Sequence, residues 1–500
     1  MCYFRIALLS VLGVFFSSIA PGQDMLGLTA GNYAGTSSIS MNPAYMPSSR
    51  YYLDFNLLEV HSYFGNNYHY IHGHDLNLLN LLSGGPYPSY GESNAFTDIY
   101  RNKADKRGYA GWTIRGPAGM MVYGEHAFGF QINFRNHSSF GNLPYDIANF
   151  LYEALDYYPQ HDILYSHKDP SQAASLTWME IGLSYAMNFH RNKWEYWSAG
   201  ITLKPLLGIS GLYGNLNHVD YYVDNDSLVF VDNLNMEYGY SLPLDYKTNA
   251  IYQGPFIRGA GIGFDIGMMY QKTERGHSTR VVTRLCDQQF EDYRYRFGLS
   301  LLDVGVISFT KRAEKRVFND ASTVWIKRHD TLPEGSIDEI NDKLDAYFSD
   351  YSGQSVKDDR FSMMLPPALS FQADYAVRND LYLSGMFIWG FNPGKSFLNR
   401  PTVIAITPRY ETPETGFALP VSVASSRWNA LRLGFYFRYY NVYIGSDKIG
   451  SILGLSDFSG ADLYFGIKLN LSRNLNMNYL KGNCGNRNYF NIETFDYRNF

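Results

Sequence analysis

Apolar and polar residues alternate with period two in many separate segments of this chain. In residues 179–190, each odd position carries a large, mostly apolar side chain and each even position a polar or small one. Similar alternation recurs in residues 128–135, 259–268 and 462–471. Because successive side chains of a strand point to opposite faces, each segment is predicted to be a β-strand with one apolar face.

Strand length and composition favour a membrane barrel over a soluble β-sandwich. Several runs extend for about 9 to 12 residues, which suits a tilted transmembrane strand better than the roughly 5 to 6 residues usual in globular sheets. The chain has 43 Tyr and 33 Phe at a mean hydropathy of -0.26, which fits alternating strands with aromatic girdles. Beyond residue 22 there is no run of 18 apolar residues that would form a membrane helix. We predict an all-β fold, a single transmembrane antiparallel barrel of about 14 strands (roughly 12 to 16). A soluble secreted β-protein is the competing interpretation.

Polar segments between the strands are predicted to be turns and loops. Tight turns are expected at residues 191–193, 378–380 and 440–441. Longer polar stretches lie between such hairpins, notably residues 311–360. Within this stretch, residues 336–348 have apolar side chains at helical spacing behind Ser336, which predicts a short amphipathic helix in a loop.

The start of the chain has the features of an export signal. Arg5 precedes the apolar run Ile6 to Phe16, which is too short to span a bilayer as a helix. Cleavage is expected after Gly22, which would remove Cys2. The exported barrel is expected to reside in the outer membrane. Cys286 and Cys484 then remain, and two inert thiols are favoured over a disulfide. The predicted division is a signal peptide (1–22), a plug-like segment (23–50), the barrel (51–472) and a tail or final strand (473–500).

Several short motifs resemble one family of bacterial barrels. They are Gly31-Asn32-Tyr33-Ala34-Gly35, Met41-Asn42-Pro43-Ala44-Tyr45 and residues 51–57, 297–305 and 442–447. The family is a Bacteroidota outer-membrane barrel family that carries a domain-of-unknown-function label. It is distantly similar to the long-chain fatty-acid transporter (FadL-like) superfamily, whose members also begin with an inward segment containing Asn-Pro-Ala. The resemblance implies a barrel of about 14 strands and no enzyme, and it supplies no catalytic residues.

Ionisable residues on the polar faces are the candidate lumen groups. They are Arg294, Arg296, Asp265, Asp374, Arg432 and Arg438. Lumen arginines can bind an anionic head group, but structural pairing with carboxylates such as Asp265 or Asp374 is the interpretation that we favour. The small residues at Gly259, Gly261 and Gly263 continue into a strand and would leave room for the N-terminal segment or a narrow pore.

No motif indicates catalysis, a cofactor or a metal. His69, His72 and His74 form the most metal-like group, but no carboxylate or thiol has a convincing spacing, so a solvated loop is favoured. The net charge of -5 and pI near 6.2 argue against nucleic acid as a partner.

The sequence leaves two functions open for a barrel surrounded by outer-membrane lipid. By analogy with the family, the first is passive passage or binding of a small hydrophobic compound, with residues 24–49 as a partial plug. The second is a non-transporting barrel that anchors a periplasmic or surface partner, as in secretion or motility machinery.

Overall fold

The computed structural model describes residues 24–472, apart from 76–87, 91–95, 154, 156, 274–289, 291, 327–335, 350–353, 379, 393–397 and 426. The expected signal peptide and C-terminal tail lie outside the described residues, as do Cys286 and Cys484. No helix among the described residues is both long and apolar enough to cross a bilayer.

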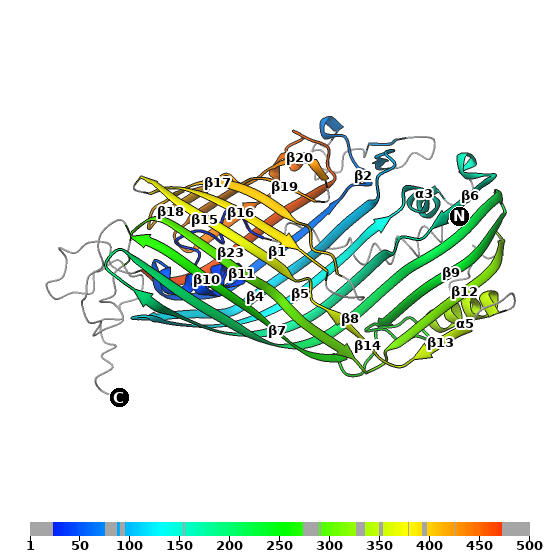
Figure 1. Cartoon of the computed structure of the whole chain (residues 1–500), viewed down its shortest axis with the longest axis horizontal. Helices are drawn as coiled ribbons and strands as arrows, with labels where there is room; N and C mark the ends of the chain where they lie inside the picture. The colour runs from blue at the N-terminus through cyan, green and yellow to red at the C-terminus, as the bar shows by residue number, and fades with distance from the viewer. Residues whose placement is uncertain are drawn as a thin grey trace.

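Fourteen strand positions form one closed antiparallel barrel, which confirms the predicted fold class and strand number (Figure 1). The wall closes because the first strand pairs with the second wall strand on one side and with the last strand on the other. In wall order the positions are β1 (Tyr51–Asn66), β4 (Lys106–Tyr123), β5 (His126–Leu143), β7 (Ser171–Arg191), β8 (Glu195–Asn225), β10 (Gly259–Thr273), β11 (Tyr293–Phe309), β14 (Phe361–Met364) with β15 (Ala368–Arg378), β16 (Leu381–Gly390), β17 (Val403–Glu411), β18 (Thr415–Ala418) with β19 (Val421–Ala424), β20 (Arg427–Leu433) with β21 (Phe435–Tyr439), β22 (Val442–Ser446) and β23 (Gly460–Ser472).

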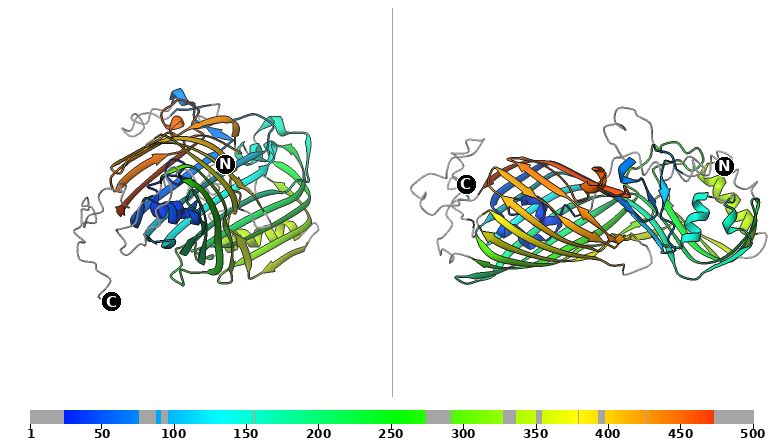
Figure 2. Two further views of the ribbon diagram at one scale, coloured as in Figure 1. Left: turned by 60° about the vertical axis from the view of Figure 1, so that its left-hand side comes forward. Right: turned by 90° about the horizontal axis from the view of Figure 1, so that it is seen from above.

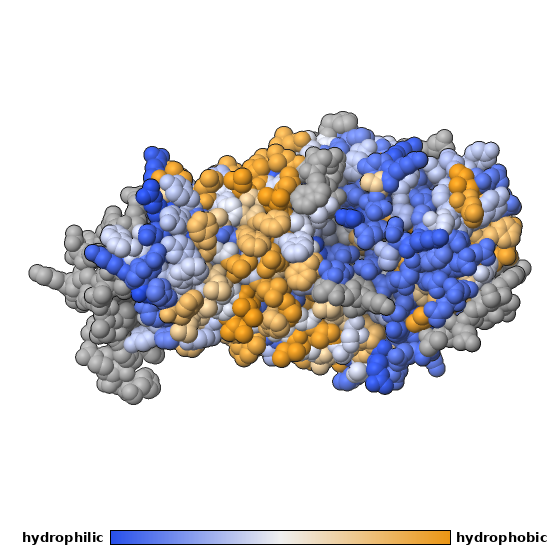
Figure 3. Space-filling model, in the orientation of Figure 1, coloured by the Kyte–Doolittle hydropathy of each residue, from blue (hydrophilic) through white to orange (hydrophobic). Residues whose placement is uncertain are grey.

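The alternation of the sequence sets the inner and outer faces of the wall. On β7, Leu183 is 52% exposed on the outside, whereas Glu180 is 1% exposed on the inside. On β10, Ile262 and Met268 face outward and Asp265 faces inward. On the face of the barrel that Figure 3 shows, the outward side chains form an apolar band, the surface that lipid tails require. The predicted facing of both strands is confirmed.

The predicted tight turns lie at one end of the barrel. β7 and β8 are joined by residues 192–194, and β21 and β22 by Tyr440 and Asn441. Tyr440 and Asp380 adopt a left-handed backbone, with φ of 47° and 63°, which lets two antiparallel strands join within a few residues. Exposed aromatic side chains such as Trp194 and Trp197 lie close to this end.

At the other end, β8 continues beyond the barrel and carries a second region, which we call the extension (Figures 1 and 2). Its sheet consists of residues 211–225 of β8 together with β6 (Ile163–His167), β9 (Leu228–Ser241), β12 (Glu314–Ile326) and β13 (Gln354–Asp358). Helices α3 (Tyr145–Glu153) and α5 (Ile337–Ser349) pack on this sheet. The core between them contains Val219, Tyr221, Phe318 and Phe348.

The extension corrects the prediction that residues 311–360 are a loop with one helix. The helix is confirmed: α5 starts after Ser336, whose hydroxyl accepts a hydrogen bond of 3.2 Å from the Glu339 backbone N–H. The flanking residues, however, form β12 and β13. Their polar composition hid them, because these strands bury only part of one face under a helix. The remaining elements are β2 (His69–Tyr70), β3 (Asp98–Ile99), α6 (Ile449–Ile452), η3 (Gly73–Asp75) and η5 (Tyr158–Gln160).

Candidate functional site

Residues 24–50, which we call the N-terminal segment, lie inside the barrel at the tight-turn end. Figure 2 shows this segment in dark blue, surrounded by the wall. It forms two short 3-10 helices, η1 (Gly35–Ser40) and η2 (Pro43–Ser48), and almost every side chain in it is buried. The lumen at this level is therefore filled by the chain itself.

Asn42 begins η2 and connects it to the wall. Its side-chain carbonyl accepts a hydrogen bond of 2.9 Å from the Ala44 backbone N–H, and Pro43 occupies the first turn, where no N–H is needed. The side-chain amide of Asn42 donates to the Gln372 Oε1 atom at 3.0 Å and to the Met268 carbonyl at 3.1 Å. The Asn-Pro-Ala motif thus both starts the helix and joins it to β10 and β15.

Glycines on the inner wall make room for η2. A Cβ atom at Gly200 would lie 2.6 Å from the Pro43 carbonyl carbon, and one at Gly298 would lie 2.7 Å from the Tyr45 hydroxyl. A Cβ at Gly267 would overlap Asn42. Gly267 belongs to the small inner face of β10, whereas Gly263 of the same face lies beside Leu206 and Leu365 instead.

Charged wall side chains bind the backbone of the N-terminal segment. The Asp447 carboxylate accepts the Leu26 N–H at 2.9 Å, and Glu411 accepts the Asn32 N–H at 3.1 Å. Arg296 donates to the Ala30 carbonyl at 2.8 Å. These hydrogen bonds give the backbone the partners that it needs in a water-poor interior. Apolar side chains of the segment also pack against the wall in buried clusters.

A basal charge cluster, formed by Arg296, Asp374, Arg409 and Glu411, lies beside the segment. Asp374 is 3.0 Å from Arg296 and 2.7 Å from Arg409, and Arg409 is 2.7 Å from Glu411. All four side chains are almost completely buried. The two arginines and two carboxylates compensate one another, as buried charges must.

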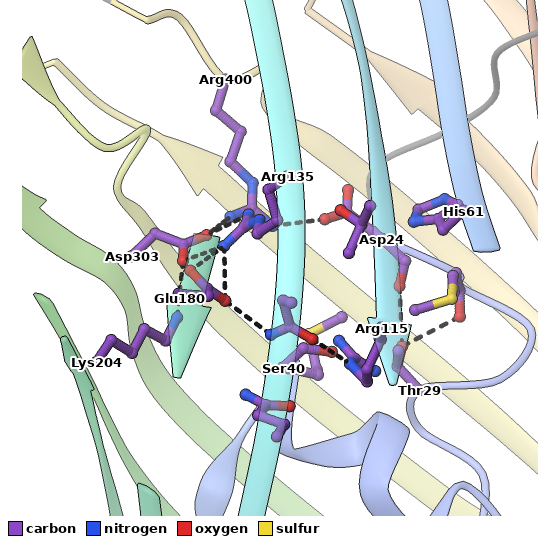
Figure 4. Close-up of a pocket in the computed structure, with 15 residues that line it drawn as sticks. Asp24, Thr29, Ser40, His61, Arg115, Arg135, Glu180, Lys204, Asp303 and Arg400 are labelled. Carbon is purple, nitrogen blue, oxygen red and sulfur yellow. Dashed lines mark hydrogen bonds and ion pairs between the residues drawn. The ribbon is translucent and has the colours of Figure 1, made fainter. Parts of the chain in front are cut away.

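A central charge cluster lies farther along the lumen and is drawn in Figure 4. Asp303 is 2.8 Å from Arg135, 2.8 Å from Lys204 and 3.4 Å from Arg400. Two further carboxylates complete the cluster: Glu180 lies 3.3 Å from Arg135 and Asp265 lies 2.7 Å from Lys204.

A polar cavity of about 40 Å³ is lined by residues of this cluster and of the N-terminal segment. Its lining includes Asp24, His61, Arg115 and Arg135. The volume suffices for on the order of three water molecules, and its polar walls would hydrogen-bond them.

Beyond the central cluster, toward the extension, the inner wall becomes apolar. We call the residues involved the inner apolar cluster: Trp178, Leu206, Ile307, Phe309, Met363, Leu365 and Leu398. The two clusters meet at Trp178, whose ring lies 4.9 Å from the Arg135 guanidinium carbon and whose Nε1 donates to Glu180 at 3.0 Å. The interior therefore changes from charged to apolar within one strand.

The predicted lumen residues lie in several different environments. Arg296 and Asp374 form a pair in the basal cluster, and Asp265 belongs to the central cluster. Arg438 is buried, with its guanidinium carbon 4.5 Å from the Tyr33 ring and a 3.0 Å hydrogen bond to the Pro413 carbonyl. Arg432 is half-buried and donates to the Tyr109 hydroxyl.

Arg294 does not face the lumen, which corrects its predicted orientation. The pairing of β10 with β11 skips this residue, since Lys272 pairs with Tyr295 and Thr273 with Tyr293. This bulge shifts the alternation by one residue, so Arg294 is exposed. Its neighbour Tyr293 is 1% exposed and donates to Asp374.

Sequence reasoning missed most of the central cluster. Glu180 and Arg135 stand on polar faces that the alternation identifies, so their burial could be expected but their pairing could not. Lys204 lies on a strand that the alternation did not single out. Arg400 lies on a connection between strands, where periodicity gives no signal. Asp303 occupies a left-handed position, with φ of 53°, that breaks the alternation of β11.

The structure describes the side chains of His69 and His72 of the histidine group. Among the described residues, no group of three or more His, Cys, Asp and Glu side chains could hold a metal ion. His69 packs against the rings of Tyr68 and Tyr152, at 4.5 Å and 4.7 Å between centroids. The side chain of His74 lies outside the described residues.

A family model covers most of this chain. The model of the family of unknown function DUF5723 matches residues 43–447. The match runs from Pro43, at the start of η2, to Asp447, just after β22. The chain belongs to this family. No curated protein matches the sequence.

Solved barrels show only a distant likeness to this DUF5723 protein. A deltaS2 mutant of the monoaromatic hydrocarbon channel TodX has a TM-score of 0.40 at 8% identity, covering 87% of this chain and 94% of that chain. The P. putida toluene transporter TodX has a TM-score of 0.38 at 9% identity, over 88% and 95%. A Pseudomonas aeruginosa FadL homologue has a TM-score of 0.26 at 10% identity, over 90% and 98%. These values are too low to support an argument about function.

Proposed function

We propose that this protein is an outer-membrane barrel that admits a small hydrophobic compound, with the N-terminal segment as its plug. The apolar band on the outer wall supports the membrane location (Figure 3). The filled lumen supports the plug, because passage requires the N-terminal segment to move. The five predicted lumen residues that face inward then have a structural role, because each pairs with groups of the wall or of its turns.

The inner apolar cluster is the observation that carries the choice of compound. The interior of a water-filled pore is polar, yet here Trp178, Ile307 and Phe309 face inward and are each no more than 1% exposed. Once the lumen opens, an apolar compound would gain favourable burial against these side chains, whereas a sugar or an ion would lose hydration there.

The test is uptake by lipid vesicles that contain the purified full-length protein. We compare a small aromatic hydrocarbon with a sugar in the native protein, in a variant lacking residues 24–49 and in Gly267→Val, which pushes Asn42 away from the wall without removing the segment. Both variants should admit the hydrocarbon faster than the native protein does. The proposal is wrong if both variants assemble heat-stable barrels and hydrocarbon uptake stays at the native level.

The extension supports a second candidate, a barrel that anchors a partner. It has its own core and lies outside the barrel, so it offers a surface that passage of a small compound does not require. Stable co-purification of a surface protein that depends on the extension, with no hydrocarbon uptake by any variant, would favour this second function.

A further inference from the structure

Residues 398–402 lie between β16 and β17, toward the end of the barrel opposite to the tight turns. In this stretch, which we call the inward loop, Leu398 and Pro401 are buried and the other three residues are half-buried. Leu398 is 3% exposed within the inner apolar cluster. The Asn399 backbone N–H donates to the Ser139 hydroxyl at 2.7 Å, and the Asn399 carbonyl is 3.0 Å from the His137 Nε2 atom. The loop is thus built into the lumen.

The inward loop meets the N-terminal segment in the middle of the barrel. The Arg400 guanidinium lies 2.6 Å from the Asp24 carboxylate, and both side chains are at most 6% exposed. Figure 4 shows Arg400 reaching from its loop into the central charge cluster, with Asp24 on the opposite side. Asp24 and Arg400 both line the polar cavity.

We propose that Arg400 interlocks the inward loop with the N-terminal segment, so that the lumen is closed by two segments that are released together. The loop closes the apolar end of the lumen with Leu398, and the N-terminal segment closes the tight-turn end. The Asp24–Arg400 ion pair joins them, and Asp303 holds the same guanidinium against the wall at 3.4 Å.

The burial of the pair explains why the two segments depend on each other. If the loop leaves, the Asp24 carboxylate loses its cation in a water-poor interior, and a buried unpaired charge is strongly unfavourable. The start of the N-terminal segment then gains by moving toward water. The reverse also holds, because Asp303 is the one carboxylate among the described residues that stays paired with Arg400 when Asp24 leaves. Such coupling between two sites is reciprocal.

Hydrogen exchange of the full-length protein in lipid vesicles tests the interlock from both sides. Arg400→Gln should raise the exchange rate of the backbone at residues 26–31 by about tenfold or more, although the substituted residue is distant in sequence. Asp24→Asn should raise the exchange rate at residues 399–402 similarly. The double variant should show less than the product of the two single effects, because both substitutions break one interaction.

A matched control separates this coupling from general loosening. Glu411→Gln weakens the hold on the Asn32 N–H, which Glu411 accepts at 3.1 Å, but leaves Asp24 and Arg400 intact. It should speed exchange near residue 32 and leave residues 399–402 at the native rate. Each variant must retain the heat-stable mobility of a folded barrel on electrophoresis, and Arg400→Lys, which keeps the charge, should restore part of the protection at residues 26–31.

The interlock is overturned if Asp24→Asn loosens only its own segment, or if the two single effects multiply in the double variant. It is overturned equally if Glu411→Gln loosens residues 399–402 as strongly as Asp24→Asn does. The inference adds to the proposed function, but its test uses no transported compound. An absence of hydrocarbon uptake would therefore refute the proposed function and leave the interlock standing.

Discussion

Strand β8 passes through both regions of the molecule, and its two halves turn opposite kinds of side chain inward. In the barrel, its inner face carries Thr202 and Lys204 and its outer face carries Ile201 and Leu203. In the extension, Val219, Tyr221 and Val223 are buried inside, while polar residues such as Asp220 and Asp224 face outward. One strand thus reverses its facing along its length.

The reversal shows that alternation identifies a strand but not its solvent. In the barrel, the apolar side chains lie outside and the interior stabilises charges by pairing them. In the extension, two helices cover an apolar inner face, and the outer face is polar, as in a soluble protein. Figure 3 displays both regions side by side, one with an apolar surface and the other with a hydrophilic one.

The largest effect should come from removing a ring from the core of the extension. Phe318 is 2% exposed, and its ring lies 5.3 Å from that of Phe348 on α5. Phe318→Ala should destabilise the packing of α5 by about 3–5 kcal/mol, because it leaves a cavity. Limited proteolysis should then cleave α5 while the barrel remains resistant. The control is Phe230→Ala on the outer face of β9, where the ring is 39% exposed and the loss should be small. Unfolding of the barrel together with α5 would contradict two separate cores.

A charge on the outer barrel wall should have the next largest effect. Leu203 is 50% exposed and pairs across the strands with Leu183 and Phe264. Leu203→Arg should lower the free energy of unfolding of the barrel in lipid vesicles by about 2–4 kcal/mol if this position lies at the middle of the bilayer. Asn217→Arg, on the same strand but in the extension, should change it by less than about 0.5 kcal/mol. Equal losses at both positions would show that the apolar band does not face lipid.

The smallest effect should be an acid-dependent loosening of α3. Burial raises the pKa of the Asp146 carboxyl, but the hydrogen bond and charge of His167 outweigh burial and hold this pKa below its ordinary 3.8. Because the pKa is depressed in the folded protein, the stabilisation is complete above about pH 4 and is lost as the pH falls through the lower value. Hydrogen exchange in α3, corrected for its intrinsic pH dependence, should rise in this range. In Asp146→Asn, exchange should already be faster at neutral pH and should show no such rise.

The barrel could be predicted from the sequence because its determinant is local. Each strand can be recognised from the alternation of its own residues. Residues 179–190, for example, are enough to assign both faces of β7. The strands of the extension were missed because they lack such a local alternation. They bury an inner face only where α3 and α5 cover it, and a polar residue such as Asp320, in a left-handed backbone with φ of 48°, breaks their period.

The site could be predicted only where it lies on regular strands. Arg296 and Asp374 lie on adjacent strands, and the alternation correctly predicted that both face inward. A bulge of one residue, which the alternation does not reveal, turns Arg294 outward. Arg400 and Asp303 could not be found, because one lies on a connection and the other at a break in the alternation. The partners of Asp24 depend on contacts across 376 residues of sequence, which no local pattern encodes.

The unbroken length of β8 has a mechanical consequence. At roughly 3.3 Å per residue, its 31 residues form a strand on the order of 100 Å long, which is continuous from the tight turn to the tip of the extension. Gly200 and Ser198, which contact the N-terminal segment, lie near one end of this strand, and Val223 lies near the other. A force applied at the tip of the extension is therefore transmitted through the covalent backbone of β8 to the part of the wall that contacts Pro43 and Ala44.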